Sequence, residues 1–174
     1  LSGRSRGGGG SARDRGGKGQ PLASPLHLLA ALDYAALKRD LTVGATGKGG
    51  YFVSGDLSQE IFRDDARFSD PTNVAEGLSR YIKALGLLFD PACSSVELLA
   101  GPTPDAATRT IYAELRSSGT LKLPWRPKVK PYAGCTRYEL DADGLICRHT
   151  ESWSISAADA FGSTLLPDAV SQLL

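Results

Sequence analysis

The chain has 174 residues, of which 41% are hydrophobic and 22% are charged, and its formal net charge is +1. This length and composition fit one globular domain with a tail rather than two domains. The small net charge excludes a global excess of positive charge, so we expect no nucleic-acid partner. The apolar runs fall far short of the roughly 20 residues that a bilayer-spanning helix needs, so we expect a soluble protein without a membrane span.

Cysteine and histidine usage limits the metal and redox chemistry. Cys93, Cys135 and Cys147 are widely spaced and odd in number, which argues against a disulfide framework and against a CxxC motif. The two histidines, His27 and His149, cannot form an HExxH motif or a histidine cluster for zinc. We therefore predict no metal site and no cofactor.

The N-terminal segment is rich in glycine, arginine and serine and holds almost nothing that could be buried, so we predict a disordered tail over residues 1–23. An arginine- and serine-rich, acid-poor leader is typical of organelle transit peptides, whereas RGG-like tracts also occur as RNA-binding arms. The lack of interleaved aromatic residues favours a transit-peptide remnant or a linker. Because the chain begins with Leu1 rather than methionine, we expect a fragment or a processed form.

A first helix is predicted from Ser24, a hydroxyl N-cap followed by proline at the first helical position, to about Leu41. Its apolar stripe is expected to pack into the core. Residues 44–50, GATGKGG, resemble a phosphate-binding loop. A Walker A motif needs serine or threonine after its lysine, and Lys48 is followed by glycine, so we predict a flexible loop instead.

The next segments predict a short helix, a brief strand and a second long helix. Residues 51–62 contain a glycine-aspartate turn and then a short helix that Ser58 could cap. A strand over residues 66–70 ends where proline follows. Apolar residues at three- and four-residue steps predict a long helix over residues 75–89.

From residue 95 onward the pattern changes to the two-residue period of strands. Strands are predicted over residues 95–100, 108–116, 121–130, 135–140 and 145–155. The Asp-Gly pair that ends residues 141–144 predicts a tight antiparallel hairpin. Helices followed by a run of strands predict an α+β fold, with N-terminal helices on one face of a curved antiparallel sheet. We assign this single domain to residues 24–166 and a C-terminal tail to residues 167–174.

Two stretches of the chain carry a family resemblance. Residues 55–71, GDLSQEIFRDDARFSDP, are similar to the signature of nuclear-transport-factor-2-like and polyketide-cyclase-like domains. Residues 121–127, LKLPWRP, and residues 136–160, which include RHTESW, resemble a family of plant and algal proteins of unknown function, mostly targeted to plastids. The resemblance implies a cone-shaped nuclear-transport-factor-2-like domain located in the chloroplast.

In such a cone, the concave face of the sheet and the helices enclose a pocket. Alternation in the last strand places Cys147, His149, Glu151 and Trp153 on one mostly apolar face, which we expect to face inward. His149 and Glu151 would then lie about 7 Å apart along the strand. Such a pair suits acid–base chemistry, and it equally suits two polar groups that satisfy each other.

The resemblance also points to Asp70, which corresponds by motif to the general base of the steroid-isomerase relatives. Tyr112, Tyr138 or Tyr51 could donate a hydrogen bond to an oxyanion opposite that base. An Asp-Pro pair also serves as a turn in noncatalytic members, so both interpretations of Asp70 stay open. Asp70 and His149 are the candidate catalytic residues. The candidate pocket residues are Tyr112, Tyr138, Cys147, Glu151 and Trp153.

Three functions fit these features. A noncatalytic pocket protein that binds a small apolar ligand, such as a pigment, isoprenoid or lipid fragment, fits the apolar inward face and is favoured. A scaffold or assembly factor would bind a protein partner or a second copy through the outside of the sheet. An isomerase, dehydratase or cyclase would use Asp70 or His149 as its acid or base.

Overall fold

The computed structural model describes residues 32–156 and residue 159. The predicted helix start at Ser24 and the predicted tails over residues 1–23 and 167–174 lie outside the described residues. The domain limits at residues 24 and 166 therefore stay a prediction. None of the helices within the described residues is long and apolar enough to cross a membrane.

One six-stranded sheet, in the order β2-β1-β6-β5-β4-β3, forms the larger part of the fold. Its neighbouring strands are antiparallel except β1 and β6, which pair in parallel. Residues 141–145 join β5 to β6 as an antiparallel hairpin and include the predicted turn over residues 141–144, with Gly144 at a φ of 83°. The strands are β1 (Phe62–Ser69), β2 (Val74–Glu76), β3 (Ser95–Asp105), β4 (Thr110–Thr120), β5 (Lys128–Leu140) and β6 (Ile146–Trp153).

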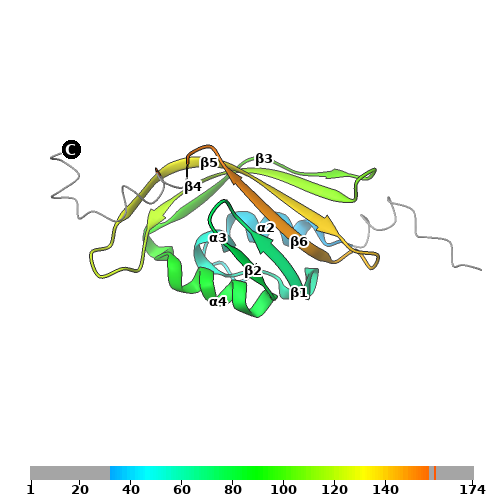
Figure 1. Ribbon diagram of the computed structural model, residues 1–174, viewed down its shortest axis with the longest axis horizontal. Coiled ribbons are helices and arrows are strands. Elements are labelled where there is room, and N and C mark those ends of the chain that lie inside the picture. Colours follow the sequence, from blue (N-terminus) through cyan, green and yellow to red (C-terminus); the bar gives the residue numbers. More distant parts are fainter. Residues whose placement is uncertain (1–31, 157–158, 160–174) are drawn as a thin grey trace, which may run out of the picture.

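The sheet arches over the helices α2 (Tyr34–Thr42), α3 (Tyr51–Ser54) and α4 (Leu78–Leu88), which lie under its concave side (Figure 1). Short 3-10 turns occur at Gln59–Ile61 and Pro91–Cys93. The predicted α+β class, with helices on one face of a curved sheet, is confirmed.

Helix α2 begins where a side chain caps it. Asp33 accepts a hydrogen bond from the backbone N–H of Ala36 at 2.9 Å, which satisfies one of the free N–H groups of the first turn. Leu37 and Leu41 from the predicted apolar stripe are fully buried. The buried carboxylate of Asp40 accepts a hydrogen bond from the backbone N–H of Ser58, which fixes α2 to the segment that leads into β1.

The predicted helix over residues 75–89 is wrong at its start. Val74–Glu76 forms the edge strand β2, and α4 begins only after Gly77, whose φ of 94° interrupts the helical backbone. Strand β2 exists because it pairs with β1, for example Phe68 with Ala75. Helical periodicity does not detect a pairing of this kind.

The predicted strands over residues 121–130 and 135–140 are also wrong in their bounds. Residues 121–127 form a loop, and β5 runs without a break from Lys128 to Leu140. Pro131 lies in this strand because the β4–β5 register shifts between Ser117 and Gly119, where a bulge removes the need for its missing N–H.

The loop over residues 44–50 is held by one carboxylate. Asp56 accepts hydrogen bonds from the backbone N–H groups of Thr46 at 2.8 Å and Lys48 at 3.1 Å. It also accepts from the hydroxyl of Thr46 at 3.0 Å. The segment predicted as a flexible loop is therefore tied to the turn that follows α3.

Candidate functional site

Strand β6 carries several polar side chains on the concave face of the sheet. His149 is fully buried, and Glu151 and Trp153 follow at two-residue steps on the same side. The register places Phe68 of β1 on one flank of His149 and Tyr138 of β5 on the other. The structure thus brings three of the predicted inward residues together on one face.

Cys147 departs from the predicted inward row. The β5–β6 register shifts next to it, so that Ile146 pairs with Leu140 while Arg148 pairs with Glu139. As a result Ile146, not Cys147, enters the core, and the Cys147 thiol lies 3.3 Å from the backbone carbonyl oxygen of Glu139. The predicted pocket role of Cys147 is therefore wrong, because a bulge breaks the alternation.

Aromatic rings enclose the side chain of His149. The ring of Tyr138 stacks on the imidazole at 4.9 Å and 19°. Four further rings lie between 5.6 and 6.2 Å from it, those of Tyr51, Phe52, Phe68 and Tyr81. Burial lowers the pKa of His149 to about 3, so the imidazole is neutral at physiological pH.

Hydroxyl groups satisfy one nitrogen of this imidazole. Nε2 of His149 lies 2.5 Å from Oγ1 of Thr136 and 3.4 Å from the hydroxyl of Tyr51. The hydroxyls of Tyr51 and Tyr138 are 2.7 Å apart. We call these four fully buried residues the histidine cluster. None of them lines the cavity described next, so His149 cannot act directly on a molecule bound there.

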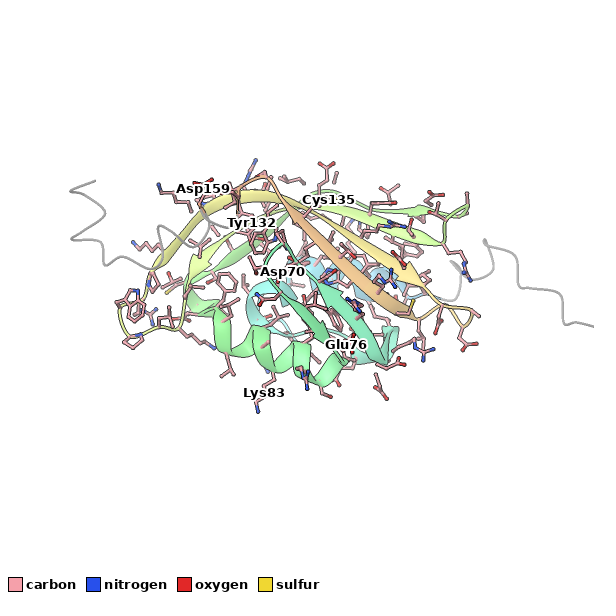
Figure 2. The ribbon with its side chains drawn as sticks, viewed as in Figure 1. Asp70, Glu76, Lys83, Tyr132, Cys135 and Asp159 are labelled. Atoms are coloured by element: carbon pink, nitrogen blue, oxygen red, sulfur yellow. The ribbon has the colours of Figure 1, made fainter. Side chains whose placement is uncertain are left out.

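A cavity of about 190 Å³ opens beside the histidine cluster, between the concave face of the sheet and the helices α3 and α4. Its lining is mostly apolar and includes the rings of Phe52, Tyr81, Phe89, Tyr132 and Trp153. The polar lining residues are Asp70, Thr72, Asn73, Ser117 and Glu151. Figure 2 shows Tyr132 and Asp70 on the concave side of the sheet, whereas Lys83 points away from it below α4.

Glu151 is a carboxyl side chain in the wall of this cavity whose acidity is changed by its surroundings. Burial, together with the nearby negative charge of Asp70, raises the pKa of Glu151 to about 7. Hydrogen bonds from the hydroxyl of Tyr81 at 3.4 Å and from Nε1 of Trp153 at 3.3 Å oppose this rise. The side chain keeps 17% of its exposure, and it lines the cavity.

Asp70 follows the last residue of β1 and lines the same cavity. Ser69 pairs with Thr150, so the next residues, Asp70 and Glu151, come to the same level of the sheet. Oδ1 of Asp70 accepts hydrogen bonds from the backbone N–H groups of Thr72 at 2.6 Å and Asn73 at 2.9 Å. Asp70 therefore holds a tight turn and also contributes a carboxylate to the cavity.

Two predicted tyrosines do not reach the cavity. Tyr112 lies on the convex face of the sheet, is 38% exposed and packs its ring 5.8 Å from the Arg137 guanidinium. Its neighbours Ile111 and Ala113 take the inward positions, so the predicted pocket role of Tyr112 is wrong. Tyr138 does face inward, but it belongs to the histidine cluster.

Sequence reasoning missed Tyr81 and Tyr132 as site residues. Tyr81 was detectable as part of the apolar stripe of α4, but a stripe does not reveal what it faces. Tyr132 lies between two predicted strands, so alternation does not assign its side chain to the inward or the outward face of the sheet. As part of one strand it shares the side of Thr136 and Tyr138, which alternation would have found.

Within residues 32–156, no three histidine, cysteine, aspartate or glutamate side chains group in a way that could hold a metal ion. Cys93, Cys135 and Cys147 are not joined by disulfides.

Comparisons with solved structures agree on the fold. The phenazine biosynthesis-related protein (phzb2) of Pseudomonas aeruginosa is 15% identical with a TM-score of 0.58, over 87% of this chain and 91% of that chain. The "Putative Isomerase" of Bacillus subtilis is 17% identical with a TM-score of 0.52, over 80% and 96%. An NTF2-like protein of unknown function from Exiguobacterium sp. 255-15 is 15% identical with a TM-score of 0.45, over 56% and 80%.

Other similar solved structures include NTF2-like, SnoaL-like and ketosteroid isomerase-like proteins. At identities under 25%, the likeness to solved structures shows the fold alone. No curated protein matches the sequence. Residues 50–149 match the family described as "Uncharacterized conserved protein (DUF2358)". The α+β fold of this chain, with a curved six-stranded sheet, is shared with the phenazine biosynthesis-related protein and the Bacillus subtilis protein. Because the family match covers more than half of the chain, the protein belongs to the DUF2358 family.

Proposed function

We propose that the protein binds a small, largely apolar molecule in the cavity, without converting it to a product. The observation that carries this proposal is a cavity of about 190 Å³ whose mostly apolar wall contains the carboxyl group of Glu151. In another protein an engineered apolar cavity of about 150 Å³ binds benzene, so the space suits a ligand somewhat larger than one ring. A few polar groups in an apolar wall are typical of ligand sites.

Glu151 would orient the ligand. With a pKa of about 7, its carboxyl group is present in both forms near neutral pH. The protonated form can donate a hydrogen bond and the ionised form can accept one. The rim is open at Thr72, Asn73 and Leu88, which line the cavity and are exposed to solvent, so a ligand has a route inward.

The two tryptophans make a direct binding test feasible. Trp153 lines the cavity and Trp125 does not, so Trp125→Phe leaves one fluorescent indole at the site. Titration of this variant with pigment, isoprenoid and lipid fragments should change the emission of Trp153 saturably for at least one class. Native mass spectrometry of the protein purified from its own source would report a ligand that is already bound.

A pair of serine variants supplies the control. Ser117→Phe would fill the cavity from β4 and should abolish the titration. Ser118→Phe adds the same ring at the next residue, which points to the other side of the strand and should leave the titration unchanged. Equal titrations for both variants, or no saturable change with any compound, would refute ligand binding in this cavity.

We also propose that the protein is located in the chloroplast. Support comes from the arginine- and serine-rich segment at residues 1–21 and from the resemblance of LKLPWRP and RHTESW to a plastid family. A fluorescent fusion to the complete precursor, expressed in plant or algal cells, tests the location. Signal outside plastids would contradict it.

A second candidate function is proton transfer in an isomerase, dehydratase or cyclase reaction. The raised pKa of Glu151 favours it, because a general base works best when its pKa lies near the ambient pH. Glu151 would then replace Asp70 and His149 as the acid or base. Incubation of a bound carbonyl compound in heavy water tests this, since only a catalyst would speed deuterium exchange next to the carbonyl, and Glu151→Gln should stop it.

A further inference from the structure

The cavity combines aromatic rings with carboxyl groups. Five of its lining residues are aromatic, and two others, Asp70 and Glu151, carry carboxyl groups. Among the described residues that line it, none is a lysine, arginine or histidine. The cavity therefore carries negative charge without a matching positive charge in its wall.

The rings are arranged as walls rather than as one stack. Tyr132 and Trp153 stand 5.7 Å apart with their planes at 58°, which forms a corner on the sheet side of the cavity. Tyr81 stands on α4 and is fixed by stacking on Phe68 at 3.8 Å and 10°. The face of an aromatic ring is electrically negative, so a pocket walled by rings attracts a cation that sheds its water.

The carboxyl group of Glu151 lacks a cationic partner among the described residues. Its hydrogen bonds come from the neutral donors Tyr81 and Trp153. Nε2 of His149 lies 3.9 Å away, and the imidazole is neutral there. A buried carboxylate whose hydrogen-bond donors are neutral, and which has the negative charge of Asp70 nearby, gains much from a cation placed beside it.

We propose that the ligand of this cavity is a small organic cation, either a quaternary ammonium or a protonated alkylamine. Its apolar substituents contact the rings of Tyr81, Tyr132 and Trp153, and its charge faces Glu151 and Asp70. This assignment rests on the proposed function, because it names the class of molecule that the same cavity binds.

Binding of such a cation is coupled to the ionisation of Glu151. A cation favours the carboxylate form, so binding below the pKa of about 7 releases a proton, and affinity rises with pH until Glu151 is ionised. The ionisable groups that face Glu151 are Asp70, Tyr51, Tyr81, Tyr132, Tyr138 and His149. Burial raises the pKa of these four tyrosines and lowers that of His149, so these five groups do not titrate near neutral pH.

Choline and its uncharged isostere, in which carbon replaces the nitrogen, separate charge from shape. We expect the Trp125→Phe protein to bind choline at least about tenfold more tightly than the isostere at about pH 8. Because choline keeps its charge at every pH, a change with pH reports the protein. Affinity for choline should fall about tenfold between pH 8 and pH 6, and affinity for the isostere should not fall.

Glu151→Gln in the same background keeps the size of the side chain and removes its charge. We expect choline to bind this variant no better than the isostere, with the pH dependence lost. Glu114→Gln makes the same change on the convex face, where Glu114 is exposed, and should leave both affinities unchanged. If Glu151→Gln does not fold, the pH profile of the unchanged cavity decides alone, and a pH-independent affinity for choline overturns the inference.

The remaining outcomes separate the two proposals. Equal affinity for choline and the isostere overturns the cationic assignment and leaves ligand binding intact. If neither choline nor the isostere binds but a neutral compound from the panel binds saturably, the cationic assignment is likewise overturned and ligand binding stays intact. If neither probe nor any compound of the panel binds, the proposed function itself falls.

Discussion

Two neighbouring regions of the concave face treat a buried polar side chain in opposite ways. His149 lies in the filled histidine cluster, and Glu151, two residues further along β6, lies in the wall of the cavity. Burial lowers the pKa of His149 to about 3 and raises that of Glu151 to about 7. Each shift favours the neutral form, but only Glu151 retains a titration near physiological pH and access to a bound molecule.

His149 and Glu151 also differ in the residues that pair with them on β5. Tyr138 of β5 faces His149 and fills the space with a ring. Further along the same pair of strands, Thr136 stands opposite Glu151, and Gly134 stands opposite Trp153. Thr136 and Gly134 line a second, much smaller cavity of about 20 Å³ that also touches Glu151 and Trp153.

The largest expected effect concerns packing in the filled region. Phe68→Ala removes a buried ring that contacts the rings of Tyr81, Phe62 and His149, and should lower the free energy of unfolding by about 4 kcal/mol. Leu88→Ala at the exposed rim of the cavity should cost less than about 1 kcal/mol. Urea unfolding measures both. Equal losses would show that the two regions are packed alike.

His149 should make the protein more stable as the pH rises. The pKa of His149 is lower in the folded than in the unfolded state. Its full contribution to the free energy of unfolding is therefore present above about pH 6.5, and this contribution is lost as the pH falls toward 3. We expect a loss on the order of 3 kcal/mol over this range. The difference in unfolding free energy between the wild type and His149→Gln, measured against pH, isolates the effect. A difference that does not vary with pH would mean that the imidazole is solvated.

Glu151 should act in the opposite direction. Its pKa is higher in the folded state, so the native state holds the proton more tightly, and stability falls as the pH rises from about 4.5 to 7. Because its side chain keeps some exposure, we expect a loss of about 2 kcal/mol. The Glu151→Gln variant should lack this loss. Its free energy of unfolding should therefore increase more steeply with pH than that of the wild type, because only the contribution of His149 remains. Parallel pH profiles for the wild type and Glu151→Gln would contradict the raised pKa.

The smallest expected effect tests the hydroxyl pair in the histidine cluster. Tyr138→Phe removes the 2.7 Å hydrogen bond to Tyr51 and should cost about 1 kcal/mol. Tyr112→Phe removes the same hydroxyl on the convex face and should change stability by less than about 0.5 kcal/mol. Thermal unfolding of the two variants makes the comparison. A loss for Tyr112→Phe as large as that for Tyr138→Phe would place Tyr112 in a structural contact.

Local sequence signals predicted the elements but not how they meet. The Asp-Gly hairpin and the two-residue period of β4 and β6 depend on neighbouring residues, so they were readable. Strand β2, the bulge beside Cys147 and the continuity of β5 through Pro131 depend on a partner strand, which no local pattern contains. For the same reason, alternation along β6 predicted that Glu151 and Trp153 face inward. The role of Tyr81 could not be predicted, because it depends on how helix α4 packs against the sheet.

The hydrogen bonds within the loop over residues 44–50 bear on whether this loop could bind a nucleotide. The backbone N–H groups of Thr46 and Lys48 point at the Asp56 carboxylate much as loop amides point at a phosphate in nucleotide sites. This anion belongs to the chain itself, so its binding to the loop is intramolecular and a dissolved anion would have to compete with it. A nucleotide phosphate would have to displace the Asp56 carboxylate from these N–H groups. With Asp56 in place, the loop is a structural connection between α2 and α3.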